Sequence, residues 1–381
     1  MYSIAGYGEM IADRLRTDAY FEALRQAVKP GAVVLDIGAG AGIFALLACR
    51  FGARKVYAIE PSDAIQVARE VAVANGCQDR IEFIQELSTK VALRERADVI
   101  VSDIRGVLPL FQHHLPSIID ARQRLLTPGG VLIPRADTMW AAVVESSERY
   151  ERYTGPWEDD HYELDMTAVR PIVTNTWSKG RVKPEQLLTE PKCWATLDYR
   201  SIDQPNVRGE VTWTASRAGT GYGLAIWFDA MLAEGVGYSN SPMSPELIYG
   251  NAFFPLPASV PVAAGDTVSV TLEADLVGDD YVWRWQTCVL TQGDPAQVKA
   301  RFHQSTFFGA PLSANRLHKR AAKYVPHVSE DGQIDRFILG LMDGQRPLDQ
   351  VARCLGERFP TRFATLQKAL SYVGDLSQRY S

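Results

Sequence analysis

A glycine-rich turn between an apolar strand and a helix constrains this chain more than any other feature. Residues 33–37 form an apolar run with β-branched side chains, and residues 38–42 read Gly-Ala-Gly-Ala-Gly. The next stretch, 43–51, has the pattern of a helix. Such a unit places free backbone amides at a helix N-terminus, and its glycines let a ligand approach the backbone closely. The sequence therefore predicts a nucleotide-binding βαβ unit in the first third of the chain.

The spacing of the glycines indicates which nucleotide is bound. A dinucleotide fingerprint requires its third glycine at the position of Ile43. The pattern G-x-G-x-G after a strand that carries Asp36 is instead typical of S-adenosylmethionine enzymes. Asp36 can hold the ammonium group of that cofactor, and Glu60, which ends the next predicted strand, can accept hydrogen bonds from both ribose hydroxyls. We therefore predict S-adenosylmethionine as the cofactor; a glycine-rich turn without a ligand is the alternative.

The order of the predicted elements changes twice along the chain. Strands and helices alternate up to about residue 135, which predicts a parallel sheet with helices on both faces. Short strands rich in Trp and Tyr follow, separated by Gly, Pro, Asp and Asn, as in an all-β barrel or sandwich. From about Leu317 the pattern is helical. We expect an α/β fold in three parts: a class I methyltransferase domain with a Rossmann-like sheet (1–136), a β-barrel domain (137–315), and a small helical or winged-helix domain (316–381).

Composition limits the partners and the compartment. The chain has 40 Lys+Arg and 45 Asp+Glu, a net charge of -5, which argues against a nucleic-acid partner. No apolar stretch is long enough to span a bilayer, and no signal peptide is apparent, so we expect no membrane association. The 5 cysteines are scattered without a CxxC pair. This pattern predicts a cytoplasmic protein without a metal site.

Residues 10–17, Met-Ile-Ala-Asp-Arg-Leu-Arg-Thr, resemble the N-terminal helix of the protein arginine methyltransferases, which folds over the cofactor. By this resemblance Arg16 pairs with the methionine carboxylate and Met10 lies near the sulfonium. The likeness extends to about residue 292 and implies that the β-barrel binds the substrate and forms a homodimer through an arm at about 161–186. The candidate cofactor-binding residues are Met10, Arg16, Asp36, Gly38, Gly40, Gly42, Ile43, Glu60, Pro61, Ser88 and Ser102.

The loop after the third predicted strand departs from this family. Two glutamates of the family bind the substrate guanidinium, which is always protonated. Here Asp103 replaces the first glutamate, Gln112 aligns with the second, and Arg105 stands where the family usually has Met. The family's Thr-His-Trp motif is also lost, because residues 247–249 read Leu-Ile-Tyr. A pocket with one carboxylate and a nearby arginine is electrostatically poor for a guanidinium.

Four residues of this loop are candidate catalytic residues: Asp103, Arg105, Gln112 and His113. Asp103 is the best candidate to orient or deprotonate the acceptor. Arg105 could bind a substrate carboxylate, or it could point to solvent or pair with Asp103. His113 has the chemistry of a general base, although a solvated loop histidine is the favoured interpretation.

We expect a methyltransferase that acts on a side chain of a peptide or protein, with arginine as the leading acceptor. Two alternatives remain: an O- or N-methyltransferase of a small metabolite with an anionic group, and a non-catalytic cofactor-binding scaffold. Residues 337–348 resemble PqqD-type peptide-binding modules, which implies peptide recognition by the C-terminal part. The alternative is a domain that only packs on the barrel.

Overall fold

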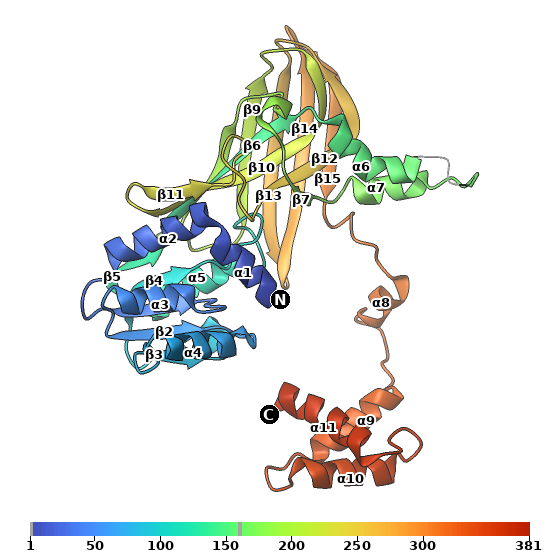
Figure 1. Cartoon of the computed structure of the whole chain (residues 1–381). Coiled ribbons are helices and arrows are strands. Elements are labelled where there is room, and N and C mark those ends of the chain that lie inside the picture. The colour runs from blue at the N-terminus through green and yellow to red at the C-terminus, as the bar shows by residue number, and fades with distance from the viewer. Residues whose placement is uncertain (1–2, 159–161) are drawn as a thin grey trace. The chain divides into compact units, whose positions relative to one another are not determined.

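The computed structural model describes residues 3–158 and 162–381. The chain divides into two compact units, Met1–Pro311 and Leu312–Ser381. The first unit contains a parallel sheet and two antiparallel sheets, and the second consists of helices (Figure 1). Among the described residues, no helix has both the length and the apolar character needed to cross a membrane.

The parallel sheet has the strand order β3-β2-β1-β4-β5. Its strands are β1 (Val33–Ile37), β2 (Lys55–Ile59), β3 (Ile81–Ile84), β4 (Ala97–Ser102) and β5 (Leu126–Ile133). All residues of β1 are buried, because a central parallel strand is covered on both faces and is therefore apolar throughout. The sequence predicted every strand but β3, whose four residues are too few, and mostly only half-buried, to give a clear pattern.

Five helices belong to this half of the unit: α1 (Ile4–Ala12), α2 (Arg14–Ala27), α3 (Ile43–Arg50), α4 (Ala64–Ala74) and α5 (His114–Arg124). Asp13 separates the first two, because its side chain caps α2 by accepting a hydrogen bond from the backbone N–H of Arg16. The other carboxylate oxygen of Asp13 accepts the N–H of Ile248, 2.8 Å away. One aspartate therefore starts α2 and ties it to a loop of the antiparallel half.

The antiparallel half combines two sheets. One sheet has the order β7-β12-β10-β6-β8 with β11 paired to β10, and the other has the order β15-β14-β13-β9. The strands are β6 (Ala136–Val144), β7 (Ser178–Gly180), β8 (Lys192–Asp198), β9 (Val207–Thr214), β10 (Gly219–Ala233), β11 (Val236–Ser239), β12 (Asn251–Val262), β13 (Thr267–Val277), β14 (Asp280–Thr291) and β15 (Asp294–Ser305). Helices α6 (Ser147–Glu158) and α7 (Arg170–Val173) lie beside these strands (Figure 1).

Aromatic side chains fill the space between the two antiparallel sheets. Trp283 and Trp285 of β14 are buried and contact Phe254 of β12 edge-on, with ring centroids 5.3 and 5.1 Å apart. Tyr281, two residues earlier on the same face, is also buried. These alternating aromatic residues therefore pack in the core and do not line a cleft.

The second unit has its own small apolar core. Helices α9 (Glu330–Leu341), α10 (Leu348–Arg358) and α11 (Leu366–Tyr380) each bury one face around residues that include Ile338, Leu355 and Val373, while α8 (Ala314–Lys319) contributes no buried residue. Residues 312–381 contain no strand. The expected helical domain is therefore observed, and its winged-helix version is wrong.

A buried guanidinium connects the two halves of the first unit. Arg105, just after β4, places Nη1 2.7 Å from Oδ1 of Asp137 on β6. Its Nη2 donates to the hydroxyls of Tyr20 on α2 and Tyr238 on β11, both at 2.5 Å, and its Nε lies 3.2 Å from Asp103. The Arg105 and Asp137 side chains have no exposed surface. Removing two charges from water costs free energy, so the buried pair of Arg105 and Asp137 is stable only with this complete set of partners.

We predict that Arg105→Met destabilises the first unit by about 3–5 kcal/mol, because Asp137 remains buried without its counter-ion. The measurement is urea unfolding followed by tryptophan fluorescence. Arg105→Met/Asp137→Asn, which removes both charges, should regain most of the loss. Arg54→Met, which breaks the exposed pair with Glu95, is the control and should cost less than about 1 kcal/mol. Equal losses for Arg105→Met and Arg54→Met would contradict this role.

The first residue of α5 is a buried histidine behind the same network. His114 Nε2 lies 3.0 Å from the Tyr199 hydroxyl, which also donates to Asp137. Burial, and then the charge of Arg105, lower the pKa of His114 to about 3. The unfolded chain has the ordinary pKa of about 6.5, so below that pH it binds a proton that the folded chain refuses.

We predict that His114 makes the fold acid-sensitive between pH 6.5 and about 3, with up to about 1.4 kcal/mol lost per pH unit. His114→Gln keeps an N–H for Tyr199 and should flatten this part of the profile of unfolding free energy against pH. His303→Gln, which changes an exposed histidine, should leave the profile unchanged. The same slope in His114→Gln and in the unchanged protein would contradict the assignment.

Candidate active site

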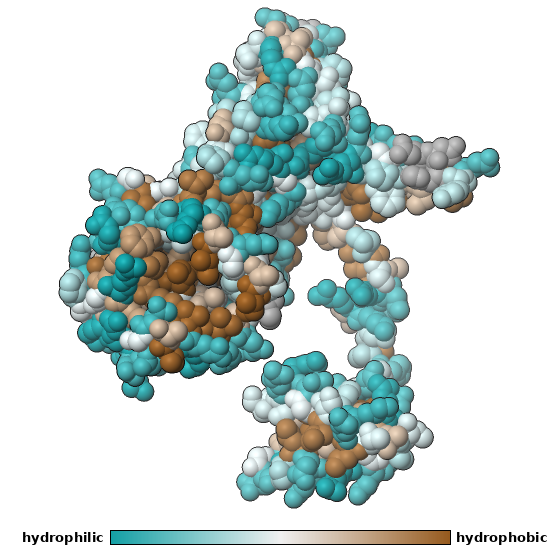
Figure 2. Space-filling view, viewed as in Figure 1, coloured by the Kyte–Doolittle hydropathy of each residue, from teal (hydrophilic) through white to brown (hydrophobic). Residues whose placement is uncertain are grey.

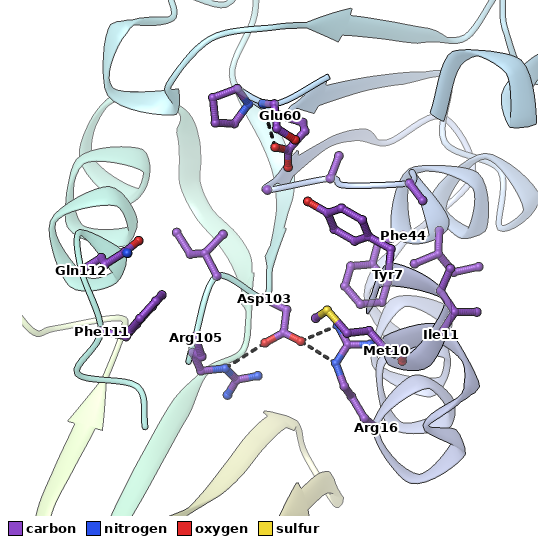
Figure 3. Close-up of a pocket in the computed structure, with 17 residues that line it drawn as sticks. Tyr7, Met10, Ile11, Arg16, Phe44, Glu60, Asp103, Arg105, Phe111 and Gln112 are labelled. Carbon is purple, nitrogen blue, oxygen red and sulfur yellow. Dashed lines mark hydrogen bonds and ion pairs between the residues drawn. The ribbon is translucent and has the colours of Figure 1, made fainter. Parts of the chain in front are cut away.

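A cavity of about 650 Å³ lies where β1, β2 and β4 end, beneath α1 (Figure 3). The carboxyl ends of parallel strands are the usual position of ligands in such sheets. Figure 2 shows apolar surface around a hollow on the part of the molecule that holds α1, α2 and α3. The lining residues are Tyr7, Met10, Ile11, Arg16, Gly38, Ala39, Ala41, Ile43, Phe44, Glu60, Pro61, Ser62, Asp103, Ile104, Arg105, Phe111 and Gln112.

Glu60 is fixed at the cavity wall by backbone amides. Its Oε2 accepts the N–H of Gly40 at 3.1 Å, and its Oε1 accepts the N–H of Ser62 at 2.9 Å. Each carboxylate oxygen can accept more than one hydrogen bond, so both keep capacity toward the cavity. This geometry fits the two hydroxyls of a ribose.

The glycines of the turn make room for the side chains that cover it. Gly38 and Gly40 have φ values of +73° and +51°, which glycine adopts without strain. A Cβ on Gly38 would lie 2.3 Å from Ile104 Cγ2, and a Cβ on Gly40 would lie 2.4 Å from Tyr7 Cε1. Ile104 and Tyr7 therefore close over the turn only because these positions lack side chains.

Two buried polar atoms beside the turn have no partner among the described residues. They are Oδ1 of Asp36 on β1 and Oγ of Ser102 on β4, on neighbouring strands where Ile37 pairs with Ser102. Oδ2 of Asp36 accepts the N–H of Ala45, and burial raises the pKa of Asp36 to about 7. Buried polar groups normally have a hydrogen-bond partner. These orphaned atoms, Glu60 and the glycine cradle together fit the polar groups of S-adenosylmethionine.

The predicted cofactor-binding residues form two groups in the structure: one group lines the cavity, and the other lies beside it. Met10, Arg16, Gly38, Ile43, Glu60 and Pro61 line the cavity, while Asp36, Gly40, Gly42 and Ser102 lie outside the lining set on the same turn and strand ends. Ser88, in the short 3-10 helix Ser88–Lys90, is buried, and its carbonyl accepts a hydrogen bond from Arg124. It does not line the cavity.

Several apolar and aromatic residues that line the cavity were not predicted from the sequence, among them Tyr7, Phe44, Ile104 and Phe111. Tyr7 lies one helical turn before Met10, so helical spacing could have placed it on the same face. No comparable signal exists for Ile104 and Phe111, because their loop has no regular period.

Asp103 lies on the side of the cavity where the methyl acceptor would bind, and both of its carboxylate oxygens have partners. Its Oδ2 accepts Arg16 Nε at 2.6 Å and the Tyr249 hydroxyl at 2.5 Å, and its Oδ1 lies 3.2 Å from Arg105 Nε. Burial raises the pKa of Asp103, but Arg16 and Arg105 outweigh it and hold the pKa below its usual value. Asp103 is therefore a fixed carboxylate that orients its neighbours, and it is a weak base.

Two predicted roles require correction. Arg105 cannot read a substrate carboxylate, because it is 2% exposed and its guanidinium is used by Asp103, Asp137 and two tyrosines; of the interpretations left open, pairing with Asp103 is observed. His113 does not line the cavity, and its half-exposed ring lies 3.2 Å from Asp279. It is a surface histidine, so its role as general base is not supported.

Arg16 and Gln112 remain at the cavity. The Arg16 guanidinium donates to Asp103 and to the carbonyl of Met10, so its expected contact with a methionine carboxylate stays a prediction. Gln112 lines the wall with the unusual φ of +42°.

The residues that stand in place of the family's Thr-His-Trp motif still hold neighbouring segments in position. Tyr249 donates its hydroxyl to Asp103, and the backbone N–H of Ile248 holds Asp13. No local pattern indicated Tyr249, because its contact joins residues 146 positions apart.

Positive and negative side chains balance at the end of the cavity where the methyl acceptor would bind. Among the described residues there, no carboxylate is left without a partner. Arg16 and Arg105 face Asp103 and Asp137, and each carboxylate already accepts hydrogen bonds from an arginine and a tyrosine. Glu60, the other acidic residue that the described part of the chain contributes to the lining, belongs to the ribose side. An incoming cation would meet an occupied ion-pair network.

Two family models match the chain in sequence. Residues 16–142 match the Ribosomal protein L11 methyltransferase (PrmA) family, and residues 135–281 match the Arginine methyltransferase oligomerization subdomain. Protein arginine N-methyltransferase 2 of Homo sapiens is 32% identical over 295 residues, 72% of this chain and 67% of that protein. Probable protein arginine N-methyltransferase 6 of Arabidopsis thaliana is 32% identical over 243 residues, and the match spans just over half of its length (55%).

Solved structures share the fold. The Trypanosoma brucei PRMT1 enzyme-prozyme heterotetrameric complex with AdoHcy has a chain with a TM-score of 0.72 at 22% identity, covering 78% of this chain and 96% of that one. Arabidopsis thaliana protein arginine methyltransferase 10 has a TM-score of 0.70 at 23% identity, covering 80% and 97%. Neither family model reaches past residue 281, and the expected likeness to PqqD-type modules gains no support.

The relatives, the two family models and the cofactor cradle agree with one another. The chain belongs to the protein arginine methyltransferase family, whose cofactor is S-adenosylmethionine.

Proposed function

We propose that this chain is an S-adenosylmethionine-dependent methyltransferase that acts on a side chain of a peptide or protein, with arginine as the leading acceptor. One observation carries the proposal: Glu60, the glycine turn and Asp103 meet in a single cavity. The bound cofactor supplies an electrophilic methyl group, and the protein's contribution to such a transfer is mainly orientation. Family membership supports arginine over other acceptors.

Different residues of the chain bind the cofactor and face the methyl acceptor. Glu60 binds the ribose hydroxyls, and Asp36 and Ser102 offer polar atoms for the amino acid end of the cofactor. Met10 and Arg16 cover the same end from α1 and α2. Asp103 faces the acceptor as a fixed carboxylate, and its lowered pKa keeps it ionised, so that it can orient a nitrogen that donates a hydrogen bond.

A non-catalytic role in cofactor binding is the second candidate. It is favoured by one observation: Asp103, the one carboxylate that the described residues place at the acceptor end of the cavity lining, is already paired with Arg16 and Arg105. The other alternative, a small metabolite with an anionic group, loses its support because its proposed handle, Arg105, is buried and paired.

A homodimer in the cytoplasm completes the proposal. The oligomerization subdomain match supports self-association. In the proposed arm, Tyr162 and Leu164 are 94% and 61% exposed, as expected for apolar groups that pack on a second copy; His161 lies outside the described residues. The cytoplasmic location is supported by five unpaired cysteines.

We predict that Glu60→Ala abolishes cofactor binding, with at least a hundredfold loss of affinity, because two hydrogen bonds to a charged acceptor are lost at about 1.5–3 kcal/mol each. Calorimetry with S-adenosylmethionine gives the measurement. Glu70→Ala, which changes an exposed glutamate of α4, is the matched control. Unchanged affinity in Glu60→Ala would refute the cofactor site.

We predict that Gln112→Glu raises methylation of an arginine-containing peptide by about tenfold, because a second carboxylate at the cavity attracts the guanidinium. Mass spectrometry of the peptide after incubation with the cofactor measures the product. Gln112→Ala removes the amide without adding charge and should not raise the rate. Absence of methylarginine in all three proteins would speak against arginine and for the non-catalytic candidate.

A further inference from the structure

A strongly basic pocket lies on the antiparallel half, separate from the cofactor cavity. It has a volume of about 330 Å³ and lies between α6, β7 and the residues that follow β7. Its basic lining residues are Arg149, Arg152, Lys179, Arg181 and Lys183. Glu148 is the one acidic residue among the described residues that line the pocket, so this lining has a large excess of positive charge.

Arg149 is built into the wall of this pocket. Its guanidinium carbon lies 5.5 Å from the ring centre of Phe253, and its Nη2 donates to the carbonyl of Arg181 at 3.1 Å. A Cβ on Gly180 would lie 1.8 Å from Nη2, so the guanidinium occupies space that glycine alone leaves open. The side chain is half-buried, and burial and Arg152 lower the pKa of Arg149. No carboxylate of the described residues forms an ion pair with this fixed arginine to stabilise its charge.

The neighbouring charges are also uncompensated. Of the five basic residues, Arg181 alone pairs with a carboxylate among the described residues, Glu246 at 3.0 Å. Arg152, Lys179 and Lys183 form no ion pair within the described chain. The hydroxyl of Ser178, also at the pocket, is buried without a hydrogen-bond partner there. Like charges held this close repel one another, and a bound anion would remove the repulsion.

We propose that this pocket binds a phosphoryl group. A phosphoryl group carries about two negative charges and three acceptor oxygens, which matches several cations and the serine hydroxyls of Ser146 and Ser178. A single carboxylate would leave most of the positive charge unpaired. Arginine in a fixed position favours phosphate because its N–H groups match two oxygens at once.

A second groove of about 660 Å³ connects this pocket with the helices above the cofactor cavity. The groove shares Lys179, Gly180 and Arg181 with the basic pocket and reaches Glu9 and Asp13 on α1 and before α2. Helix α1 contributes Met10 and Ile11 to the cofactor cavity. A phosphorylated side chain of an extended peptide can therefore occupy the basic pocket while the peptide follows the groove; free inorganic phosphate offers the same chemistry.

Calorimetry on the full chain tests this site. The probes are inorganic phosphate, a short phosphoserine peptide and its unphosphorylated twin, all at one ionic strength. We expect one-to-one binding of the two phosphoryl probes and none of the twin. Arg149→Gln should weaken binding by about tenfold or more, and Arg152→Gln, whose exposed side chain is not needed for folding, by severalfold. Arg50→Gln, an exposed arginine at the end of α3, is the matched control.

The outcomes distinguish a phosphopeptide from free phosphate as the source of the phosphoryl group, and they include results that would overturn the proposal. Tighter binding of the phosphopeptide than of inorganic phosphate identifies a peptide as the source, and equal affinities identify free phosphate. The proposal is overturned if neither phosphoryl probe binds, if the twin binds as well, or if Arg50→Gln loses as much affinity as Arg149→Gln. The assay needs no methyl transfer, so its result is independent of the proposed enzymatic activity.

Discussion

The buried guanidinium of Arg105 is the interaction on which this structure depends. It joins the end of β4 to β6, β11 and α2, so one buried charge contacts elements of both the parallel and the antiparallel half. A charge removed from water is tolerated only when its partners are complete. Asp137, Asp103 and two tyrosines supply them, and their positions are therefore fixed relative to the sheet that carries the cofactor turn.

The same interaction shapes the acceptor end of the cavity. Because Asp103 is shared between Arg16 and Arg105, its charge is largely neutralised before any substrate arrives. The cofactor side has no such competition: Glu60 is held by backbone amides, and Asp36 keeps an oxygen without a partner among the described residues. The chain therefore has a well-formed cofactor site and an acceptor site with unusual electrostatics for its family.

The arginine side chains in the basic pocket beside α6 have different surroundings from those of Arg105. There Arg149 is held in place, and no carboxylate in the described part of the chain forms an ion pair with it, although the protein as a whole is acidic. Around Arg105 the guanidinium donates to two carboxylates and two tyrosine hydroxyls of the chain, whereas the one hydrogen bond described for the Arg149 guanidinium goes to the carbonyl of Arg181. The difference between a structural cation and a binding cation is thus visible in what surrounds each guanidinium.

The sequence by itself determined the parallel sheet, the all-β part rich in Trp and Tyr, the helical C-terminal unit, and the cofactor turn with Glu60. These features depend on local periodicity and on glycines whose backbone angles other residues rarely adopt. Only the tertiary structure decided the roles of Arg105, Tyr249, His113 and Arg149. A side chain's partners come from distant segments, as Asp137 does for Arg105, and no local pattern records which distant charges will meet in the folded protein.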